Sequence, residues 1–513
     1  METKKSHSTK VNTKINRRKF VGMTSTALAF SIVPRHILGG TNFVAPSDKI
    51  TLAYIGIGSQ GLKEMLPMLT VPEIQIVAVC DPNKEAVGYR DWGRDYLRDS
   101  VRKLLNDPTW TSGGDKVVPG GRDNGKNIVD RYYALTRASE KIKSCNAYTD
   151  FRDMFDKEKN LDSVKIMTPD HLHGLIAMAA MKRGKHVTMH KPIANRLLEG
   201  KQVIDVAKKS NVTTHMIAWD SNAKMDAIME LLNSGAIGTL NEVHNWTNRP
   251  VWPQYPTLPT DTPPVPAGLD WNLWLGPERD RPYHPNYTNM VFRGWYDFGG
   301  GSMADMGYYS LWALFNALQL ESPTIIEPNR SHTCGFNEMI PFRVKNDFSF
   351  PMASTVRFKF PAKGNRPPVD LCWYDGGMRP PVPEELYQQN KEMPQEGMMF
   401  VGDQGKILAG FHGNNPQVIS GKRAEPVKGI PNHDGDSKYI PRTFVDAIKA
   451  GKQCAGSFRD AWPITEAANL YAVALRTGKT LYYDAASQKI TNSSEANAYL
   501  GREYRKGFEL TSI

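Results

Sequence analysis

The chain has 513 residues, of which 40% are hydrophobic, 10% aromatic and 23% charged. This length predicts two or three domains, and the composition excludes collagen-like, disordered and multispanning membrane proteins. The formal net charge is +11, but residues 1–46 carry eight basic residues against Glu2 alone, a net +7, which leaves +4 for the remainder. A nucleic-acid-binding surface is therefore not indicated.

The first 46 residues have the pattern of an export signal. A basic stretch ends at Asn16-Arg17-Arg18-Lys19-Phe20, and a weakly apolar run follows over residues 21–34. That run is shorter than the about 20 apolar residues that span a bilayer, and paired arginines before a phenylalanine resemble a twin-arginine signal. We expect residues 1–46 to be this signal and a linker, and the protein to be periplasmic without stable membrane insertion. A disordered basic tail on a cytoplasmic protein is the alternative, because no Ala-x-Ala cleavage site follows.

Residues 50–81 predict a βαβ unit with a glycine-rich turn. An apolar run over 50–57 leads into a predicted helix over 62–69 and a second apolar run over 74–80. The turn between the first two reads Gly56-Ile57-Gly58-Ser59-Gln60-Gly61. In such a turn the first glycine permits the bend, the second admits a pyrophosphate and the third lets the helix pack on the strand.

Asp81 ends this unit, 20 residues beyond Gly61. An acid at that position binds ribose hydroxyls and repels a 2′-phosphate. The sequence therefore predicts that this unit binds NAD, in preference to NADP. A glycine turn with a purely structural role is the alternative.

The alternation of strands and helices continues to residue 217. Residues 91–145 are polar and glycine-rich, and we interpret them as an insertion. The pattern beyond it predicts strands over 163–168, 186–189 and 213–217, with helices over 171–183 and 195–210. Such alternation indicates a doubly wound parallel sheet, a Rossmann domain over residues 47–220, whose ligand lies at the carboxyl ends of the strands. Three groups reach that edge, namely Asp81, the run 168–173, and His190 with Lys191.

Asp170, His171 and His173 are residue types that bind zinc or iron. Residues two apart do not share one face of a helix, so we predict no metal site there. The five cysteines also include no Cys-x-x-Cys pair, and neither a zinc ribbon nor a dense disulfide framework is indicated.

Beyond residue 220 the pattern changes to alternating strands such as 241–247 and 353–360, followed by a helical tail over 440–477. We predict a second domain over 221–513, of α+β type with a large open, mostly antiparallel sheet. Several aromatic and charged residues are candidates to bind a carbohydrate, because sugar C–H faces stack on aromatic rings. They are Trp219, Asp220, Arg249, Trp252, Arg293, Trp295 and Tyr296. Packing inside the domain is the alternative for the aromatic members.

Together these segments resemble the Gfo/Idh/MocA family of oxidoreductases over residues 48–510. Besides the glycine turn, the resemblance rests on His190-Lys191-Pro192, where the family has Glu-Lys-Pro. It also rests on residues 300–307, which follow the Gly-Gly-x-x-x-Asp-x-Gly part of a family segment that ends in a histidine. Residues 246–250, 269–277 and 293–298 are similar to an exported bacterial branch. The fold that this implies agrees with the α/β architecture predicted above.

The resemblance implies a nicotinamide-dependent enzyme acting on a sugar. Lys191 then lies beside the reacting hydroxyl, and Asp305 orients the substrate. The residues Thr168, Pro169, Asp170, His173 and His190 would contact the cofactor. The family also implies a homodimer or homotetramer joined through the open sheet.

Two positions differ from the family pattern. His190 replaces the motif glutamate, and Tyr309 stands where many relatives carry the general-base histidine. A tyrosine transfers protons near neutral pH only with a strongly lowered pKa. Either Lys191 acts alone or Tyr309 serves as a hydrogen-bond donor.

Three functions are consistent with these residues. The first is an exported NAD-dependent oxidoreductase that oxidises a ring hydroxyl of a sugar or glycoside to a keto-sugar, with a tightly bound cofactor because a periplasm offers little free NAD. The second is an NAD-dependent glycosidase that oxidises the sugar transiently, eliminates the aglycone and shows no net redox change. The third is an inactive sugar-binding protein.

Overall fold

The computed structural model describes residues 44–85, 89–91, 93, 95–112, 117–140, 142–218, 223–420, 423–426 and 440–510. The chain divides into two compact units, residues 1–48 and 49–513. In the first unit the described part contains one 3-10 turn, η2 (Pro46–Asp48), and the predicted signal lies outside the described residues. No helix among the described residues is long and apolar enough to cross a membrane.

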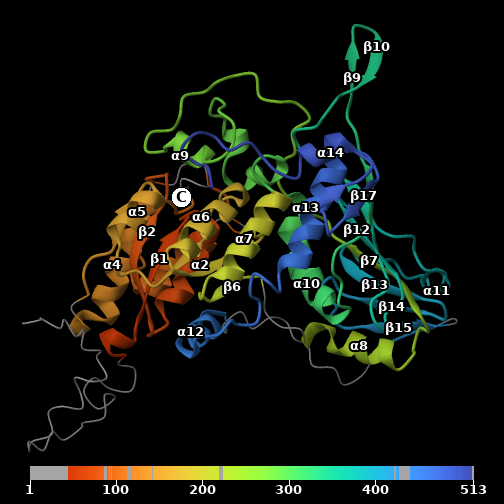
Figure 1. Ribbon diagram of the computed structural model, residues 1–513, viewed down its shortest axis with the longest axis horizontal. Coiled ribbons are helices and arrows are strands. Elements are labelled where there is room, and N and C mark those ends of the chain that lie inside the picture. The colour runs from red at the N-terminus through yellow and green to blue at the C-terminus, as the bar shows by residue number, and fades with distance from the viewer. Residues whose placement is uncertain are drawn as a thin grey trace, which may run out of the picture. The chain divides into compact units, whose positions relative to one another are not determined.

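The second unit begins with a six-stranded parallel sheet in the order β3-β2-β1-β4-β5-β6 (Figure 1). The central strands are buried on both faces, as their near-continuous apolar sequence requires. The predicted doubly wound sheet is confirmed. Its strands are β1 (Ile50–Ile55), β2 (Ile74–Cys80), β3 (Asn146–Tyr148), β4 (Ser163–Ile166), β5 (His186–Met189) and β6 (Thr214–Met216).

Helices connect these strands. The predicted helices are present as α2 (Ser59–Leu69), α6 (Asp170–Lys182) and α7 (Leu197–Lys209), and α5 (Phe151–Lys157) joins β3 to β4. The polar stretch between β2 and β3 contains α3 (Tyr96–Leu105), α4 (Arg122–Thr136) and the short turn η3 (Ala138–Glu140).

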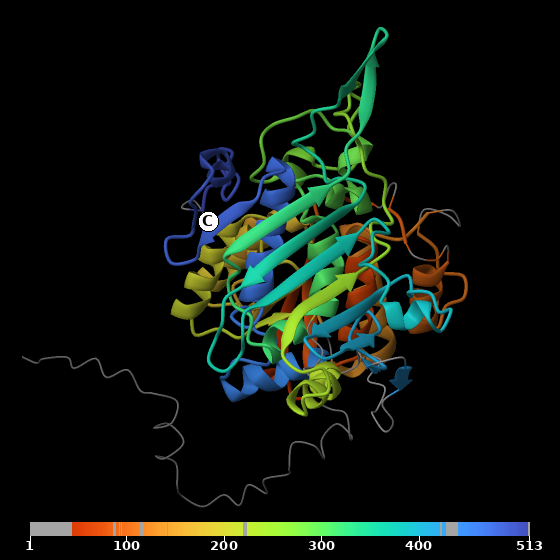
Figure 2. The same ribbon diagram turned by 90° about the vertical axis from the view of Figure 1, so that its right-hand side faces the viewer.

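A ten-stranded sheet forms the other half, in the order β16-β15-β14-β13-β7-β12-β11-β8-β17-β18, and Figure 2 looks onto its outer face. Strands β7 and β12 pair in parallel and the other neighbours pair antiparallel, so the predicted mostly antiparallel sheet is confirmed. The strands are β7 (Leu240–Trp246), β8 (Ile325–Arg330), β11 (Ser354–Phe360), β12 (Val369–Asp375), β13 (Gly397–Gly402), β14 (Lys406–Ala409), β15 (Gln417–Ser420), β16 (Arg423–Pro426), β17 (Leu481–Asp484) and β18 (Lys489–Ile490).

The remaining elements lie around this sheet. They are the helices α8 (Asp226–Asn233), α9 (Trp271–Leu275), α10 (Tyr308–Ala317), α11 (Glu384–Tyr387), α12 (Ile440–Ala450), α13 (Trp462–Thr477) and α14 (Ser494–Ala498), the 3-10 turns η4 (Ala223–Met225), η5 (Pro285–Tyr287) and η6 (Asn289–Gly294), the π-helical turn η7 (Met303–Gly307), and the separate hairpin β9 (Cys334–Asn337) and β10 (Ile340–Arg343).

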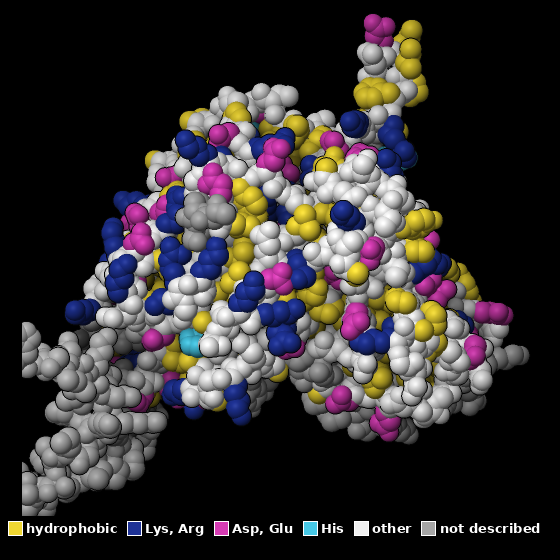
Figure 3. All heavy atoms as spheres, viewed as in Figure 1, with side chains coloured by type: hydrophobic (Ala, Val, Ile, Leu, Met, Phe, Trp, Pro, Cys, Tyr) yellow, Lys and Arg dark blue, Asp and Glu magenta, His cyan; other side chains and the backbone are white. Residues whose placement is uncertain are grey.

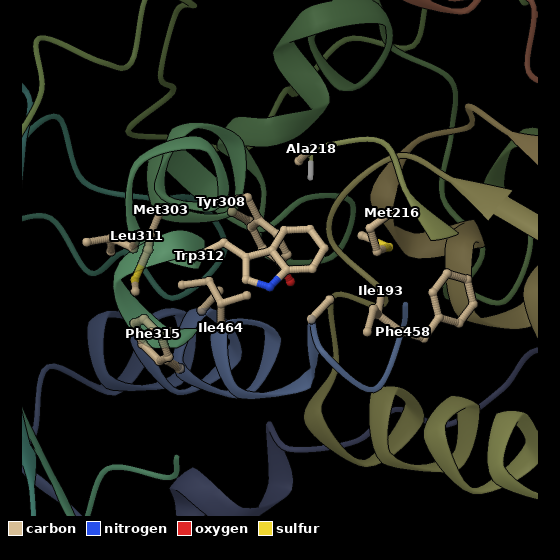
Figure 4. Packing of buried hydrophobic residues seen from close by; sticks show 14 of the residues in the cluster. Ile193, Met216, Ala218, Met303, Tyr308, Leu311, Trp312, Phe315, Phe458 and Ile464 are labelled. Carbon is tan, nitrogen blue, oxygen red and sulfur yellow. The ribbon is translucent and has the colours of Figure 1, made fainter. Parts of the chain in front are cut away.

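One hydrophobic core joins the two sheets through α10 and α13. Trp312 of α10 is 1% exposed and packs near Ile464 of α13 and Met216 of β6 (Figure 4). Its indole N–H donates to the carbonyl of Asp460 at 3.1 Å. Truncating so large a buried side chain typically costs about 3–5 kcal/mol, so this shared core fixes the edge of one sheet against the other.

The last part of the chain returns to the parallel sheet. The N–H of Met216 in β6 donates to the carbonyl of Gly456 at 2.9 Å, and Val445 of α12 belongs to the cluster on the outer face of β1 and β2. Arg502 lies between Glu199 of α7 and Glu278, with all three side chains less than 7% exposed. The segment after residue 440 therefore stabilises both halves.

Candidate functional site

A cavity of about 400 Å³ opens at the carboxyl edge of the parallel sheet and is walled by both halves of the unit. Fifteen of its lining residues were predicted from the sequence: Gly56, Gly58, Ser59, Gln60, Gly61, Asp81, Thr168, Pro169, His190, Lys191, Arg249, Trp252, Arg293, Asp305 and Tyr309. The edge lies where β1 has β2 on one side and β4 on the other, which is the place where ligands of doubly wound sheets bind.

The glycine turn is shaped by close backbone packing. Gly56 has a φ of +93°, and a Cβ on it would lie 2.5 Å from the carbonyl carbon of Met167. A Cβ on Gly61 would lie 2.3 Å from the oxygen of Gly56, whereas one on Gly58 would meet only the ring of Tyr89 at 3.4 Å. Gly58 is the N-cap of α2 and no side chain caps this helix start, so the first amides of α2 are available to an anion.

Asp81 lines the cavity beside this turn and is 5% exposed. Its carboxylate accepts hydrogen bonds from the backbone N–H of Ile57 at 2.6 Å and of Asn83 at 2.8 Å. Burial raises the pKa of Asp81 to about 6, and these two N–H donors limit the rise. The carboxylate therefore holds the glycine turn, and Ile57 lies buried behind that turn.

Lys191 is 1% exposed and its ammonium donates to Oδ1 of Asp305 at 2.6 Å. The same ammonium lies 5.2 Å from the centroid of the Tyr309 ring. Burial lowers the pKa of Lys191 to about 8, with Asp305 opposing the shift and Arg293 adding to it. An amine with such a pKa exchanges protons near neutral pH.

Asp305 and Asp170 share one guanidinium. Nη1 of Arg293 lies 3.1 Å from Oδ1 of Asp170, and its Nε lies 3.5 Å from Oδ1 of Asp305. Asp170 is fully buried behind the cavity wall, where it also accepts from the N–H of Gly300 at 3.1 Å. Burial acts to raise the pKa of Asp305, but Lys191 and Arg293 outweigh it and hold that pKa below its usual range. Asp305 is therefore a carboxylate that positions the lysine.

The two positions that differ from the family pattern contact each other. Nε2 of His190 lies 3.2 Å from the hydroxyl of Tyr309, and both residues line the cavity. Burial raises the pKa of Tyr309, so the phenol keeps its proton. Burial, assisted by Lys191, lowers the pKa of His190 well below its usual range, so the imidazole is neutral. The pair consists of a phenol donor and an imidazole that accepts or relays a proton.

The hydroxyl of Thr168 and the indole N–H of Trp252 are buried in the cavity wall without a hydrogen-bond partner among the described residues. Buried polar groups in proteins are nearly always satisfied, so both atoms indicate a ligand with hydroxyl or carbonyl groups.

Other predicted residues lie outside the cavity wall. Both ring nitrogens of His173 face carbonyl oxygens, of Pro192 at 2.6 Å and of Thr168 at 2.8 Å, and so hold two loops. Trp295 and Tyr296 are 1% and 3% exposed and pack among aromatic rings, which agrees with the packing alternative. Trp219 and Asp220 lie outside the described residues. Within the described ranges, no three His, Cys, Asp or Glu side chains gather as a metal site.

Sequence reasoning missed part of the wall. Lys63 lies two residues after the glycine turn, and its positive charge could have indicated a place in the wall. Tyr89, Arg90 and Asp91 come from a stretch without hydrophobic periodicity, so no pattern marked them. Further missed lining residues are Pro82, Met167, Leu172, Trp274, Asn289, Met290, Phe292 and Met306.

Residues 124–218 match the family model for the oxidoreductase family, NAD-binding Rossmann fold, and residues 222–327 and 386–510 match the model for its C-terminal alpha/beta domain. Levoglucosan dehydrogenase of Pseudarthrobacter phenanthrenivorans is 34% identical over 97 residues, 18% of this chain and 24% of that protein. A glycosyl hydrolase family 109 protein of Shewanella baltica is 20% identical over 219 residues, 42% of this chain and 39% of that protein. The chain thus matches less than half the length of these curated relatives.

Two solved structures are similar to the chain at low identity. Levoglucosan dehydrogenase in complex with NADH and L-sorbose is 15% identical with a TM-score of 0.46, covering 85% of this chain and 98% of its own. Aldose-aldose oxidoreductase from Caulobacter crescentus, complexed with glycerol, is 14% identical with a TM-score of 0.46, covering 85% and 99%. Because family models match the Rossmann half and the α/β half together over more than half of its length, the chain belongs to the Gfo/Idh/MocA family of NAD-binding oxidoreductases.

Proposed function

We propose that this protein is an NAD-dependent oxidoreductase that converts a ring hydroxyl of a sugar or glycoside into a ketone. The observation that carries the proposal is the position of Lys191. Its amine, held by Asp305 at 2.6 Å, lines the same cavity as the glycine turn. In this proposal residues 47–220 bind the nucleotide, and residues 221–513 supply the substrate wall and the contacts of a homo-oligomer.

The residues present fit a dinucleotide. The uncapped start of α2 would hold the pyrophosphate, Asp81 the ribose hydroxyls, and Thr168 with Pro169 the nicotinamide half. A bound NAD⁺ supplies the hydride acceptor, so that an alcohol that loses a hydride and a proton becomes a ketone. Asp81 favours NAD over NADP because a 2′-phosphate would meet its carboxylate. Arg90 lines the same cavity, and its positive charge would attract the 2′-phosphate and so favour NADP.

Lys191 is the group placed to accept the hydroxyl proton. With a pKa of about 8, a useful share of the lysine is the neutral amine near neutral pH. Asp305 and Arg293 restrict the amine to one position, which lowers the entropy lost in reaching the reactive geometry. Tyr309 keeps its proton, and with substrate bound its hydroxyl would turn from His190 to donate a hydrogen bond to the substrate oxygen.

A carbohydrate suits the rest of the wall. Trp252 and Trp274 offer ring faces for sugar C–H groups, and Arg249 and Arg293 offer donors for hydroxyls or a carboxylate. The indole N–H of Trp252 is buried and has no partner in the described structure. A substrate hydroxyl would satisfy it.

A second function has specific support, an NAD-dependent glycosidase without net redox change. Oxidation of one ring carbon acidifies the neighbouring C–H, and a base that removes this proton allows the aglycone to leave. Water then adds, and return of the hydride restores the alcohol. The neutral imidazole of His190 beside Tyr309 is a candidate for that base, and several curated relatives carry the name glycosyl hydrolase family 109.

Mass spectrometry distinguishes the oxidoreductase from the glycosidase. The NAD-loaded protein is incubated with a pool of free sugars and glycosides and a keto-sugar acceptor. A product two hydrogens lighter than its parent supports the oxidoreductase, and released aglycone without a keto product supports the glycosidase. Retained sugar binding with neither product, in the protein and in its Lys191→Ala variant alike, supports an inactive binding protein.

We also propose that the protein works in the periplasm after twin-arginine export. A folded protein on that route carries its nucleotide with it. Fractionation of cells that produce the full chain tests this, with Arg17→Lys/Arg18→Lys as the matched variant. Loss of the periplasmic pool in that variant is the expected result, and an unchanged distribution contradicts export by this route.

A further inference from the structure

The hairpin of β9 and β10 projects away from the body of the unit (Figures 1 and 2). Phe336, Met339, Ile340 and Phe342 on it are 75%, 90%, 70% and 47% exposed. An isolated two-stranded hairpin is marginally stable in water, and clustered exposed apolar side chains mark contact surfaces. This arm therefore has the properties of a segment that another surface covers.

Both faces of the arm are apolar. Phe336 pairs across the hairpin with Pro341 and shares one face with it. Phe342 and Ile340 lie on the other face, where the Phe342 ring covers Gly335 so closely that a Cβ there would lie 3.0 Å away. A flat surface would cover only one face. The arm instead suits a groove that surrounds it.

Such a groove of about 710 Å³ lies at the root of the same arm. Its apolar walls come from Tyr255, Phe350 and Met352, the last 55% exposed. Gln254 and Arg476 also line it, and Oε1 of Gln254 and Nε of Arg476 are buried without a hydrogen-bond partner among the described residues. The groove thus combines apolar and polar side chains.

The arm is acidic at its tip, and the groove at its root is mostly basic. Glu338 occupies the turn at the tip, with a φ of +55°. Arg330, His332, Arg343 and Lys345 line the groove at the root, and Asp347 and Glu495 are its acidic residues. Figure 3 shows this order, with an acidic group at the end of the arm, hydrophobic side chains along it and basic groups at its root. An arm of this kind is complementary to a second copy of itself in antiparallel alignment.

We propose that two copies of the chain exchange these hairpins, each tip entering the root groove of the other copy. A strand rises about 3.3 Å per residue, so two four-residue arms that overlap fully bring each Glu338 to the other copy's Arg343 and Lys345. The arrangement closes under a two-fold axis, because the same contact is made twice. A bilayer suits the arm less well, since insertion would place the Glu338 carboxylate deepest in the membrane.

This contact would also act on the candidate site. Residues 249–256 form one loop, in which Arg249 and Trp252 line the cavity while Gln254, Tyr255 and Pro256 line the groove. A hairpin bound in the groove would therefore stabilise the 249–256 loop, which supplies part of the cavity wall. The pairing itself does not depend on the proposed reaction.

Engineered disulfides test the pairing directly. In a Cys334→Ser background, which removes the exposed native thiol, Glu338→Cys and Lys345→Cys are made singly and together in the full chain. After mild oxidation, a covalent dimer on non-reducing gels is expected for the double variant and not for either single variant. A dimer from Glu338→Cys alone would overturn the proposal in favour of tip-to-tip contact. A double variant that stays uncrosslinked would also overturn it.

Light scattering after size exclusion provides a second measurement. Met339→Asp and Glu338→Lys are each expected to weaken dimerisation at least tenfold, and Glu338→Lys/Lys345→Glu to restore it. Glu503→Lys, at an 84% exposed glutamate far along the chain, is the matched control. A monomeric wild-type protein, or a mass that neither tip variant changes, would overturn the proposal, as would tip-dependent binding of the monomer to anionic phosphatidylserine vesicles.

Discussion

The ammonium of Lys191 and the carboxylate of Asp305 meet at 2.6 Å, although the residues are 114 positions apart. Lys191 follows β5 in the parallel sheet and Asp305 lies on η7 before α10. Their contact therefore exists only because the shared core holds α10 against the parallel sheet. The site is a property of the junction of the two halves.

Replacing Lys191 by alanine should lower turnover strongly and spare folding. General acid–base catalysis contributes about 100- to 10,000-fold, and we expect a loss of kcat in that range with sugar binding largely retained. Lys165→Met is the matched control, because Lys165 is also buried, 3% exposed, and pairs with Glu64 at 3.6 Å outside the cavity. Equal losses of kcat per folded molecule in both variants would contradict the role of Lys191.

The Asp305→Asn variant should shift the pH profile of oxidation. The active form of Lys191 is the neutral amine, so kcat/KM rises with pH through its pKa of about 8. The Asp305 charge raises that pKa, and its removal should move the rising limb to lower pH while the plateau falls. The measurement is kcat/KM from pH 6 to 10. If the rising limb stays in place or moves to higher pH, Lys191 is not the group whose titration produces it.

Two glycine substitutions should separate folding from nucleotide binding. Gly61→Ala brings a Cβ to 2.3 Å from the Gly56 oxygen, and such overpacking costs about 1–3 kcal/mol, so both Tm and NAD affinity should fall. Gly58→Ala meets only Tyr89 at an ordinary 3.4 Å, so Tm should hold while affinity falls, since the pyrophosphate would contact the new methyl group. Thermal unfolding and calorimetric titration with NAD⁺ give both values. Unchanged affinity in Gly58→Ala would argue against a pyrophosphate at this turn.

Asp81 should make nucleotide binding depend on pH. The carboxylate accepts ribose hydroxyls better than the acid does, so NAD⁺ affinity should rise as pH increases through the Asp81 pKa of about 6. Asp81→Asn should flatten this dependence and shift the NADP/NAD affinity ratio about tenfold, equivalent to about 1.4 kcal/mol. Fluorescence titrations between pH 5 and 8 measure both. Arg90→Ala tests the opposing charge, and it should weaken NADP binding alone.

Arg502 should stabilise the fold far more than a surface arginine does. Arg502→Met leaves Glu199 and Glu278, 1% and 6% exposed, without one of their partners. Breaking buried pairs typically costs about 3–5 kcal/mol. Arg279→Met breaks a pair with Glu503 whose side chains are 78% and 84% exposed, and little change is expected. Urea unfolding compares the two, and equal midpoints would show that the buried cluster contributes no net stability.

Much of the fold was predictable because its signals are local. The strands at 50–55, 74–80, 163–166 and 186–189 are apolar runs of β-type residues, and the glycine turn lies at the expected place. Strand β3 was missed, since its three residues, Asn146, Ala147 and Tyr148, form no apolar run and are exposed or half-buried. The hairpin of β9 and β10 was missed because its apolar residues face solvent, so no burial pattern marks it.

The site was predictable where charge or a motif marks it. Lys191, Asp305 and Asp81 all reach the cavity. Asp170 and His173 lie in the first turn of α6, after a correctly predicted strand, yet they lie behind the wall, because side-chain direction at a helix start depends on tertiary packing. The contact between His190 and Tyr309 depends on the junction of the two halves, which no local pattern specifies.

The return of the C-terminal segment to α7 has a kinetic consequence. Arg502 ties residues near residue 510 to Glu199 of α7 and to Glu278, which lies between α9 and η5. Swinging the two halves apart would separate these buried charges, so a nucleotide cannot leave by a wide hinge opening at low cost. On the proposed function, a dinucleotide held in this way would behave as a prosthetic group and not as a co-substrate. It would be reduced and reoxidised in place, one sugar leaving before the next enters, and ping-pong kinetics are the expected result.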